Sequence, residues 1–122
     1  MLSNIDLAER FLDALSSKDL FRVKELLNEN VRLEYPGLSA IHGRSKAILL
    51  LKMILSRFDS LRFEAVDRIE DGKKLCVVWK NSGRLKTGAP FHNEGITVLH
   101  IANGEIGYVN DYFKQDRVGF HS

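Results

Sequence analysis

The chain has 122 residues, a length typical of one domain. Hydrophobic residues make up 44% and charged residues 28%, which argues against a largely disordered chain. Eighteen basic and sixteen acidic residues give a net charge of +2 and are interspersed, which excludes the concentrated basic face of a typical nucleic-acid-binding protein.

The sequence predicts a cytoplasmic protein without a membrane segment. Its longest apolar run, residues 47–51, has five residues, whereas a membrane span needs about 18. Residues 1–10 contain no basic segment followed by an apolar one, so we expect no signal peptide. The single Cys76 excludes an internal disulfide and a multi-cysteine zinc site, as expected in a reducing compartment.

Three helices are predicted in the first half of the chain. Apolar residues recur at helical spacing over residues 4–16, where Ser3 and Asp6 form the pattern of a capping box. A short second helix is expected over residues 20–27, and a third over residues 45–58. Between these two, residues 31–35 alternate apolar and polar side chains, which predicts a strand before Pro36.

The second half is predicted to contain four strands. They span residues 61–69, 75–80, 91–101 and 105–114, separated by turns at 70–73, at 81–84 and at Asn103-Gly104. The Asn-Gly pair favours a tight hairpin, which links the last two strands as antiparallel neighbours. Helices followed by an antiparallel meander predict an α+β domain.

Several short motifs accompany this order of elements. They are residues 11–15 (Phe-Leu-Asp-Ala-Leu), 35–36 (Tyr-Pro), 41–43 (Ile-His-Gly), 103–106 (Asn-Gly-Glu-Ile) and 111–113 (Asp-Tyr-Phe). Together they resemble the NTF2-like superfamily, which includes SnoaL-like polyketide cyclases, ketosteroid isomerases and limonene-epoxide hydrolases. The resemblance covers nearly the whole chain and implies a single SnoaL-like domain over residues 1–122.

The resemblance also implies an architecture. Three N-terminal helices would pack on a strongly curved antiparallel or mixed sheet, forming a cone with one apolar pocket. Relatives of this kind usually form a homodimer through the outer face of the sheet. Outward-facing Ile96, Val98 and Tyr108 fit that arrangement, because a monomer would expose a continuous apolar surface.

Ketosteroid isomerase activity proper is not expected. In those enzymes the general base is an aspartate just before the proline that follows the first strand, and here that position is Tyr35. A phenol, with an ordinary pKa of about 10, is a poor base at neutral pH. The two oxyanion donors of that family correspond to Phe11 and Thr97, of which Phe11 has no donor.

Asp111 is the main candidate catalytic residue, with Tyr35 as its partner. Asp111 matches the second aspartate of the limonene-epoxide hydrolases, but residues 77–80 lack the arginine and aspartate expected beside it. SnoaL-like cyclases are thought to use one acidic residue in an apolar pocket for proton transfer next to a carbonyl, and Asp111 fits that role. In the alternative interpretation, Asp111 only forms a cap or a salt bridge at a sheet edge, for example with Lys114 or Arg117.

Helix periodicity and strand alternation anchored at Asp111 predict which side chains converge on the pocket. The predicted pocket residues are Phe11, Leu15, Tyr35, Leu51, Leu55, Thr97, Leu99, Val109 and Phe113, together with Asp111.

No metal or cofactor is expected. His92 and His100 lie on one strand roughly 27 Å apart, too far to share a metal. His42 packs before the third helix or lines the pocket mouth, and His100 faces the dimer interface. Neither a phosphate-binding loop nor a dinucleotide fingerprint occurs.

Two functions remain open from the sequence. The first is an acid/base isomerase, cyclase or hydrolase acting on a small apolar compound, polyketide-, steroid- or terpenoid-like. The second is a non-catalytic module that binds such a ligand or dimerises.

Overall fold

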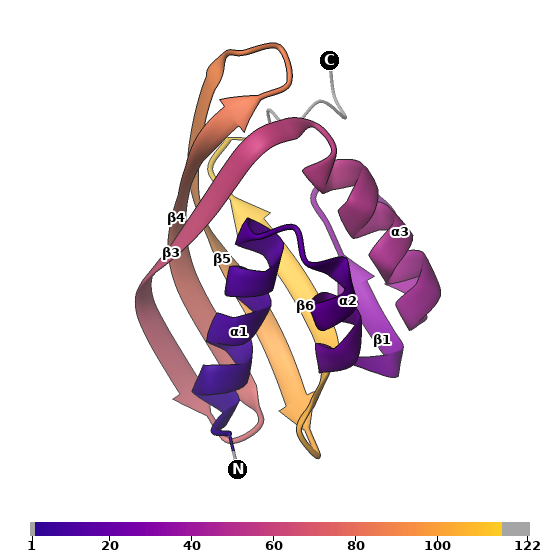
Figure 1. Cartoon of the computed structure of the whole chain (residues 1–122). Coiled ribbons are helices and arrows are strands. Elements are labelled where there is room, and N and C mark those ends of the chain that lie inside the picture. The colour runs from indigo at the N-terminus through magenta and orange to yellow at the C-terminus, as the bar shows by residue number, and fades with distance from the viewer. Residues whose placement is uncertain (1, 116–122) are drawn as a thin grey trace.

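Three helices lie against one face of a single sheet (Figure 1). This computed structural model describes residues 2–115. Within that range the helices are α1 (Asn4–Ser16), α2 (Leu20–Leu26) and α3 (Arg44–Leu55). The strands are β1 (Leu27–Glu34), β2 (Ile41–His42), β3 (Phe58–Asp71), β4 (Lys74–Leu85), β5 (Pro90–Ala102) and β6 (Glu105–Phe113). The predicted α+β class is confirmed.

Helix α1 has the bounds and the cap that its sequence predicts. Ser3 Oγ accepts a hydrogen bond from the Asp6 amide at 3.1 Å, and the Ser3 amide donates to Asp6 Oδ2 at 3.3 Å. This capping box satisfies two amides that have no carbonyl partner within the helix. Leu7, Phe11 and Leu15 are buried on one face, which packs α1 against β3.

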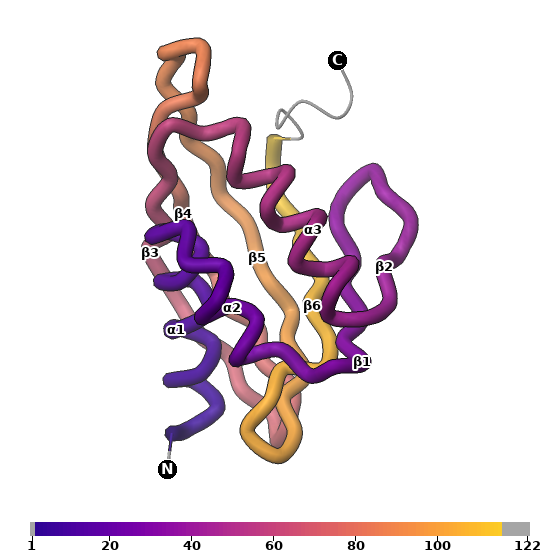
Figure 2. Tube along the Cα trace, turned by 45° about the vertical axis from the view of Figure 1, so that its right-hand side comes forward, coloured from indigo at the N-terminus to yellow at the C-terminus, as the bar shows by residue number. Residues whose placement is uncertain are grey.

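The strands form one mixed sheet in the order β2-β1-β6-β5-β4-β3. Strands β3 to β6 make the predicted antiparallel meander, whereas β1 pairs in parallel with β6. Figure 2 shows β3 and β4 at one edge of the sheet, β1 and β2 at the other, and α3 in front of the strands between them. This helix-covered, unclosed sheet has the architecture implied by the resemblance.

Strand β4 is longer than predicted, and the predicted turn at residues 81–84 is wrong. The strand continues to Leu85, and the turn lies at 86–89, where the Leu85 amide donates to the Ala89 carbonyl at 2.9 Å. Gly83 therefore serves close strand packing rather than a turn. A Cβ atom at Gly83 would lie 2.0 Å from the Ser60 carbonyl oxygen of β3.

The boundaries of α3, β3 and β1 also differ from the prediction. Helix α3 ends at Leu55, and Phe58 begins β3, where its ring packs edge-on to Phe91 with centroids 4.9 Å apart. Strand β1 begins at Leu27 rather than at residue 31, and the predicted loop contains the short strand β2. Leu27 at the start of β1 pairs with β6, and Phe58 at the start of β3 pairs with β4. Local sequence patterns do not encode such pairing between strands.

The register of the site depends on the hairpin between β5 and β6 and on an irregularity just beyond it. Asn103 and Gly104 have φ values of 55° and 75°, the left-handed conformation that a tight hairpin turn requires. The pairing of β5 with β6 shifts by one residue between His100 and Ile101, and beyond this bulge Thr97 on β5 lies opposite Asp111 on β6. None of the helices in residues 2–115 is both long and apolar enough to cross a membrane.

Candidate active site

A small cavity lies between the helices and the inner face of the sheet. Its volume is about 50 Å³, well below the roughly 300–1,000 Å³ of pockets that hold drug-sized ligands. Most of its wall is apolar. The lining residues are Leu15, Tyr35, Leu51, Ile54, Leu55, Phe58, Leu61, Phe63, Trp79, Asn81, Asn93, Asp111 and Phe113.

Three side chains on neighbouring strands form a hydrogen-bonded chain beside the cavity. The Trp79 indole on β4 donates to Thr97 Oγ1 on β5 at 2.8 Å. Thr97 Oγ1 in turn donates to Asp111 Oδ1 on β6 at 2.6 Å. An indole N–H can only donate, so the Thr97 hydroxyl accepts from Trp79, and it gives its own proton to Asp111. The chain therefore fixes Oδ1 as an acceptor.

The surroundings of Asp111 favour its neutral form. Burial raises the pKa of Asp111 from 3.8 to about 6, and the hydrogen bond from Thr97 opposes part of this rise. No residue between 2 and 115 donates a hydrogen bond to the other oxygen, Oδ2. Oδ2 is thus the oxygen at which the carboxyl group can bind and release a proton near neutral pH.

Tyr35 lies at the end of β1, where its ring packs near Phe113 with centroids 5.5 Å apart. Burial, followed by the negative charge of Asp111, raises the pKa of the Tyr35 phenol, and the Arg57 cation opposes the rise. The phenol therefore stays protonated at neutral pH. Tyr35 can donate a hydrogen bond within the cavity, and it cannot serve there as a general base.

Two asparagines face each other across β4 and β5 in the cavity wall. Asn93 ties β5 to the end of the described chain: its Nδ2 donates to the Gln115 carbonyl at 2.7 Å, and its Oδ1 accepts from the Gln115 amide at 3.1 Å. Asn81 differs from it. Its Oδ1 atom is buried and has no hydrogen-bond partner among residues 2–115.

The structure brings most of the predicted pocket residues together. Leu15, Tyr35, Leu51, Leu55, Asp111 and Phe113 line the cavity. Phe11, Leu99 and Val109 are buried in the core and do not line the cavity. Thr97 is not a lining residue either, but its hydroxyl group is hydrogen-bonded to Asp111.

The remaining polar candidates lie elsewhere. Lys114 pairs with Glu94 at 3.3 Å rather than with Asp111, and Arg117 lies outside the described residues. His42 is exposed on β2 and is not part of the cavity lining. The His100 ring lies against Tyr108, with centroids 4.6 Å apart.

Sequence reasoning missed Asn81 and Arg57. The inward alternation through Val77 and Trp79 leads directly to Asn81, but the turn predicted at 81–84 removed that residue from the strand. Arg57 follows α3 and acts on the cavity through its charge beside Tyr35. No local motif marks it, because it reaches this region only through the tertiary fold.

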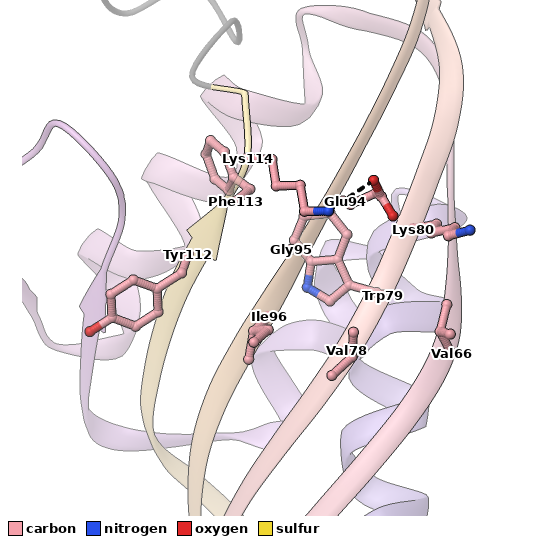
Figure 3. A pocket seen from close by; sticks show the side chains of 10 residues that line it. All are labelled: Val66, Val78, Trp79, Lys80, Glu94, Gly95, Ile96, Tyr112, Phe113 and Lys114. Carbon is pink, nitrogen blue, oxygen red and sulfur yellow. Dashed lines mark hydrogen bonds and ion pairs between the residues drawn. The ribbon is translucent and has the colours of Figure 1, made fainter.

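A second, more open depression of about 340 Å³ lies on the outer face of the sheet (Figure 3). Val66, Val78, Ile96 and Tyr112 form its apolar part, and the ion pair of Lys114 with Glu94 lies at its side. Each of its charged side chains is solvent-exposed. Since nothing there has the buried carboxyl of the inner cavity, the inner cavity is the better candidate active site.

Comparison with known proteins agrees with this fold. Residues 8–109 match the family model of the SnoaL-like domain. The chain belongs to the SnoaL-like domain family. No curated protein matches the sequence.

Solved structures with the same fold have low sequence identity to this SnoaL-like domain. An NTF2-like protein from Anabaena variabilis has a TM-score of 0.84 and 15% identity, over 95% of this chain and 94% of that one. A Catenulispora acidiphila protein with a ketosteroid isomerase-like fold has a TM-score of 0.83 and 14% identity, over 93% and 88% of the two chains. An LEH-like epoxide hydrolase from M. tuberculosis has a TM-score of 0.79 and 22% identity, over 91% and 82%. These matches establish the fold, which several activities share.

Proposed function

We propose that this SnoaL-like domain transfers a proton next to a carbonyl group in a small apolar compound, with Asp111 as the acid/base. The observation that carries the proposal is a carboxyl group with a pKa raised to about 6 in a mainly apolar cavity. Near neutral pH such a group exists in both its charged and its neutral form, so it can take up a proton and give it back.

The proposed step uses two residues. Asp111 Oδ2 takes a proton from the carbon beside the carbonyl, and the electron pair of the broken C–H bond moves into the enolate. The neutral Tyr35 phenol donates a hydrogen bond to the carbonyl oxygen, where negative charge develops. Asp111 then gives a proton back to carbon. At a different position this completes an isomerisation; at the same position it completes a hydrogen exchange, once the carboxyl group has exchanged its proton with solvent.

The size of the cavity restricts the substrate. A volume of about 50 Å³ suits only the carbonyl end of a compound whose remainder lies outside the cavity. We therefore propose that a polyketide-, steroid- or terpenoid-like compound would enter only with its reactive end.

Hydrogen exchange into a ketone tests this function. We would incubate 2-butanone with the protein in D₂O and follow the loss of its α-hydrogen signals by ¹H NMR. Asp111→Asn is expected to lower the catalysed rate by about 10²- to 10⁴-fold, the usual effect of losing a general base. The same change at exposed Asp13 serves as the control. A wild-type rate equal to that of buffer would reject the proposal.

A non-catalytic binding module is the second candidate, and the state of Thr97 favours it. Thr97 corresponds to an oxyanion donor of the ketosteroid isomerases, yet its hydroxyl proton is already given to Asp111. It therefore cannot donate to a ligand oxygen, which leaves Tyr35 to hold the carbonyl. Ligand binding without hydrogen exchange would decide for this candidate.

We also propose that the domain forms a homodimer through the outer face of its sheet. Ile96 is 39% exposed and Tyr112 is 58% exposed there, beside Val66 and the half-buried Val98. Contiguous apolar surface of this kind is unusual on a monomer.

A further inference from the structure

Asn81 is a buried side chain whose amide oxygen has no hydrogen-bond partner among residues 2–115. It is only 8% exposed, it lies in the wall of the inner cavity, and its Oδ1 has no partner among residues 2–115. A buried amide without a partner is costly, and folded proteins seldom keep one unless a ligand or a water satisfies it. The wall of the cavity thus holds a recognition group that the protein's own side chains leave open.

Two neighbouring polar side chains, Thr97 and Asn93, already use their hydrogen-bonding groups within the protein. The Thr97 hydroxyl joins the Trp79 indole to Asp111, and the Asn93 amide is bonded to the backbone at Gln115. Asn81 lies opposite Asn93 on β5, but the amide of Asn93 forms its hydrogen bonds with the backbone of Gln115 and not with Asn81. The amide of Asn81 is therefore available for a bound molecule.

We infer that Asn81 is a specificity-determining residue that selects ligands carrying a hydroxyl or N–H group in addition to the carbonyl. The amide oxygen of Asn81 accepts the hydrogen bond from that group, while Tyr35 and Asp111 engage the carbonyl end. This inference rests on the proposed function for the position of the carbonyl. It narrows the ligand class to small hydroxy- or amino-carbonyl compounds.

Two probes separate this inference from simple apolar binding. Hydroxyacetone and 2-butanone differ by a hydroxyl in place of a methyl group, so they are nearly equal in size. Trp79 is the single tryptophan of the chain and lines the cavity, so its fluorescence reports binding there. Trp79 also borders the outer depression, and the response of the inner-cavity variants Asn81→Leu and Phe63→Leu distinguishes the two sites.

Wild-type protein is expected to bind hydroxyacetone roughly 3- to 10-fold more tightly than 2-butanone, the effect of one added neutral hydrogen bond. Asn81→Leu, which keeps the volume and removes the amide, should abolish that preference. Phe63→Leu changes the apolar wall of the same cavity and should preserve it. Equal wild-type affinities, or no fluorescence change with either probe, would overturn the inference without recourse to any variant.

The hydrogen-exchange assay keeps the two proposals apart. Exchange of 2-butanone that depends on Asp111, together with equal affinities for the two probes, would overturn only the role of Asn81. A hydroxyl preference that depends on Asn81, without any exchange, would support that role and reject proton transfer.

Discussion

Replacing Asp111 with asparagine should make the protein more stable at neutral pH and change how its stability depends on pH. The pKa of Asp111 is about 6 in the folded chain and 3.8 as its ordinary value. Between these two values the folded state holds a proton that the unfolded state has lost. The free energy of unfolding of the wild type therefore falls as the pH rises from about 4 to about 6, and then levels off.

The size of this effect follows from the shift. A difference of about two pKa units corresponds to about 3 kcal/mol, at about 1.4 kcal/mol per unit. Asparagine carries no charge and keeps an oxygen that can accept the hydrogen bond from Thr97. Relative to wild type, Asp111→Asn should therefore gain about 3 kcal/mol of unfolding free energy between pH 4 and pH 8.

Urea unfolding followed by Trp79 fluorescence measures this difference at each pH. Other titrating groups are common to both proteins, so their contributions cancel in the comparison. Asp13→Asn, on the exposed side of α1, is the matched control and should differ from wild type by a constant amount. If the difference between Asp111→Asn and wild type were also constant across this range, the assignment of Asp111 to a desolvated site would be refuted.

Further predictions concern Thr97, Gly83 and the outer face of the sheet. Thr97→Val removes the donor that lowers the pKa of Asp111 and the acceptor of the Trp79 indole, so that pKa should rise further in an NMR titration. The same variant should lose about 1–3 kcal/mol in urea unfolding, because it leaves a buried N–H unpaired. Gly83→Ala should lose about 1–3 kcal/mol, because its Cβ would meet the Ser60 carbonyl, whereas Gly107→Ala, with open space around it, should stay within about 0.5 kcal/mol of wild type. Light scattering should give twice the chain mass of 13.9 kDa for the wild type and a monomer for Ile96→Glu; a wild-type monomer at micromolar concentration would reject the dimer.

Local signals were sufficient for the elements whose patterns are complete within a few residues. The capping box at Ser3 begins α1, and the turn at Asn103-Gly104 links β5 to β6. Alternation anchored at Asp111 predicts that Asp111 and Phe113 share a face, and both line the cavity. The bulge between the turn and Asp111 was not predicted.

Tertiary contacts determined what the sequence patterns did not predict. Glycine is common in turns, which is why the sequence predicts a turn at Gly83. In the structure Gly83 lies within a long strand, where the close approach of the Ser60 carbonyl leaves no room for a side chain. That misassignment concealed the inward position of Asn81. The hydrogen-bonded chain from Trp79 through Thr97 to Asp111 joins three strands, and its existence depends on a register that no local pattern contains.

A ¹³C NMR titration of the Asp111 carboxyl group is the most direct test of this site. The Asp111→Asn variant identifies the signal, because it lacks that signal and leaves the other carboxyl groups in place. A midpoint at about pH 6 is expected if Asp111 is a desolvated acid poised for proton transfer in the cavity. A midpoint at about pH 4, the ordinary value of an aspartate in water, would contradict it.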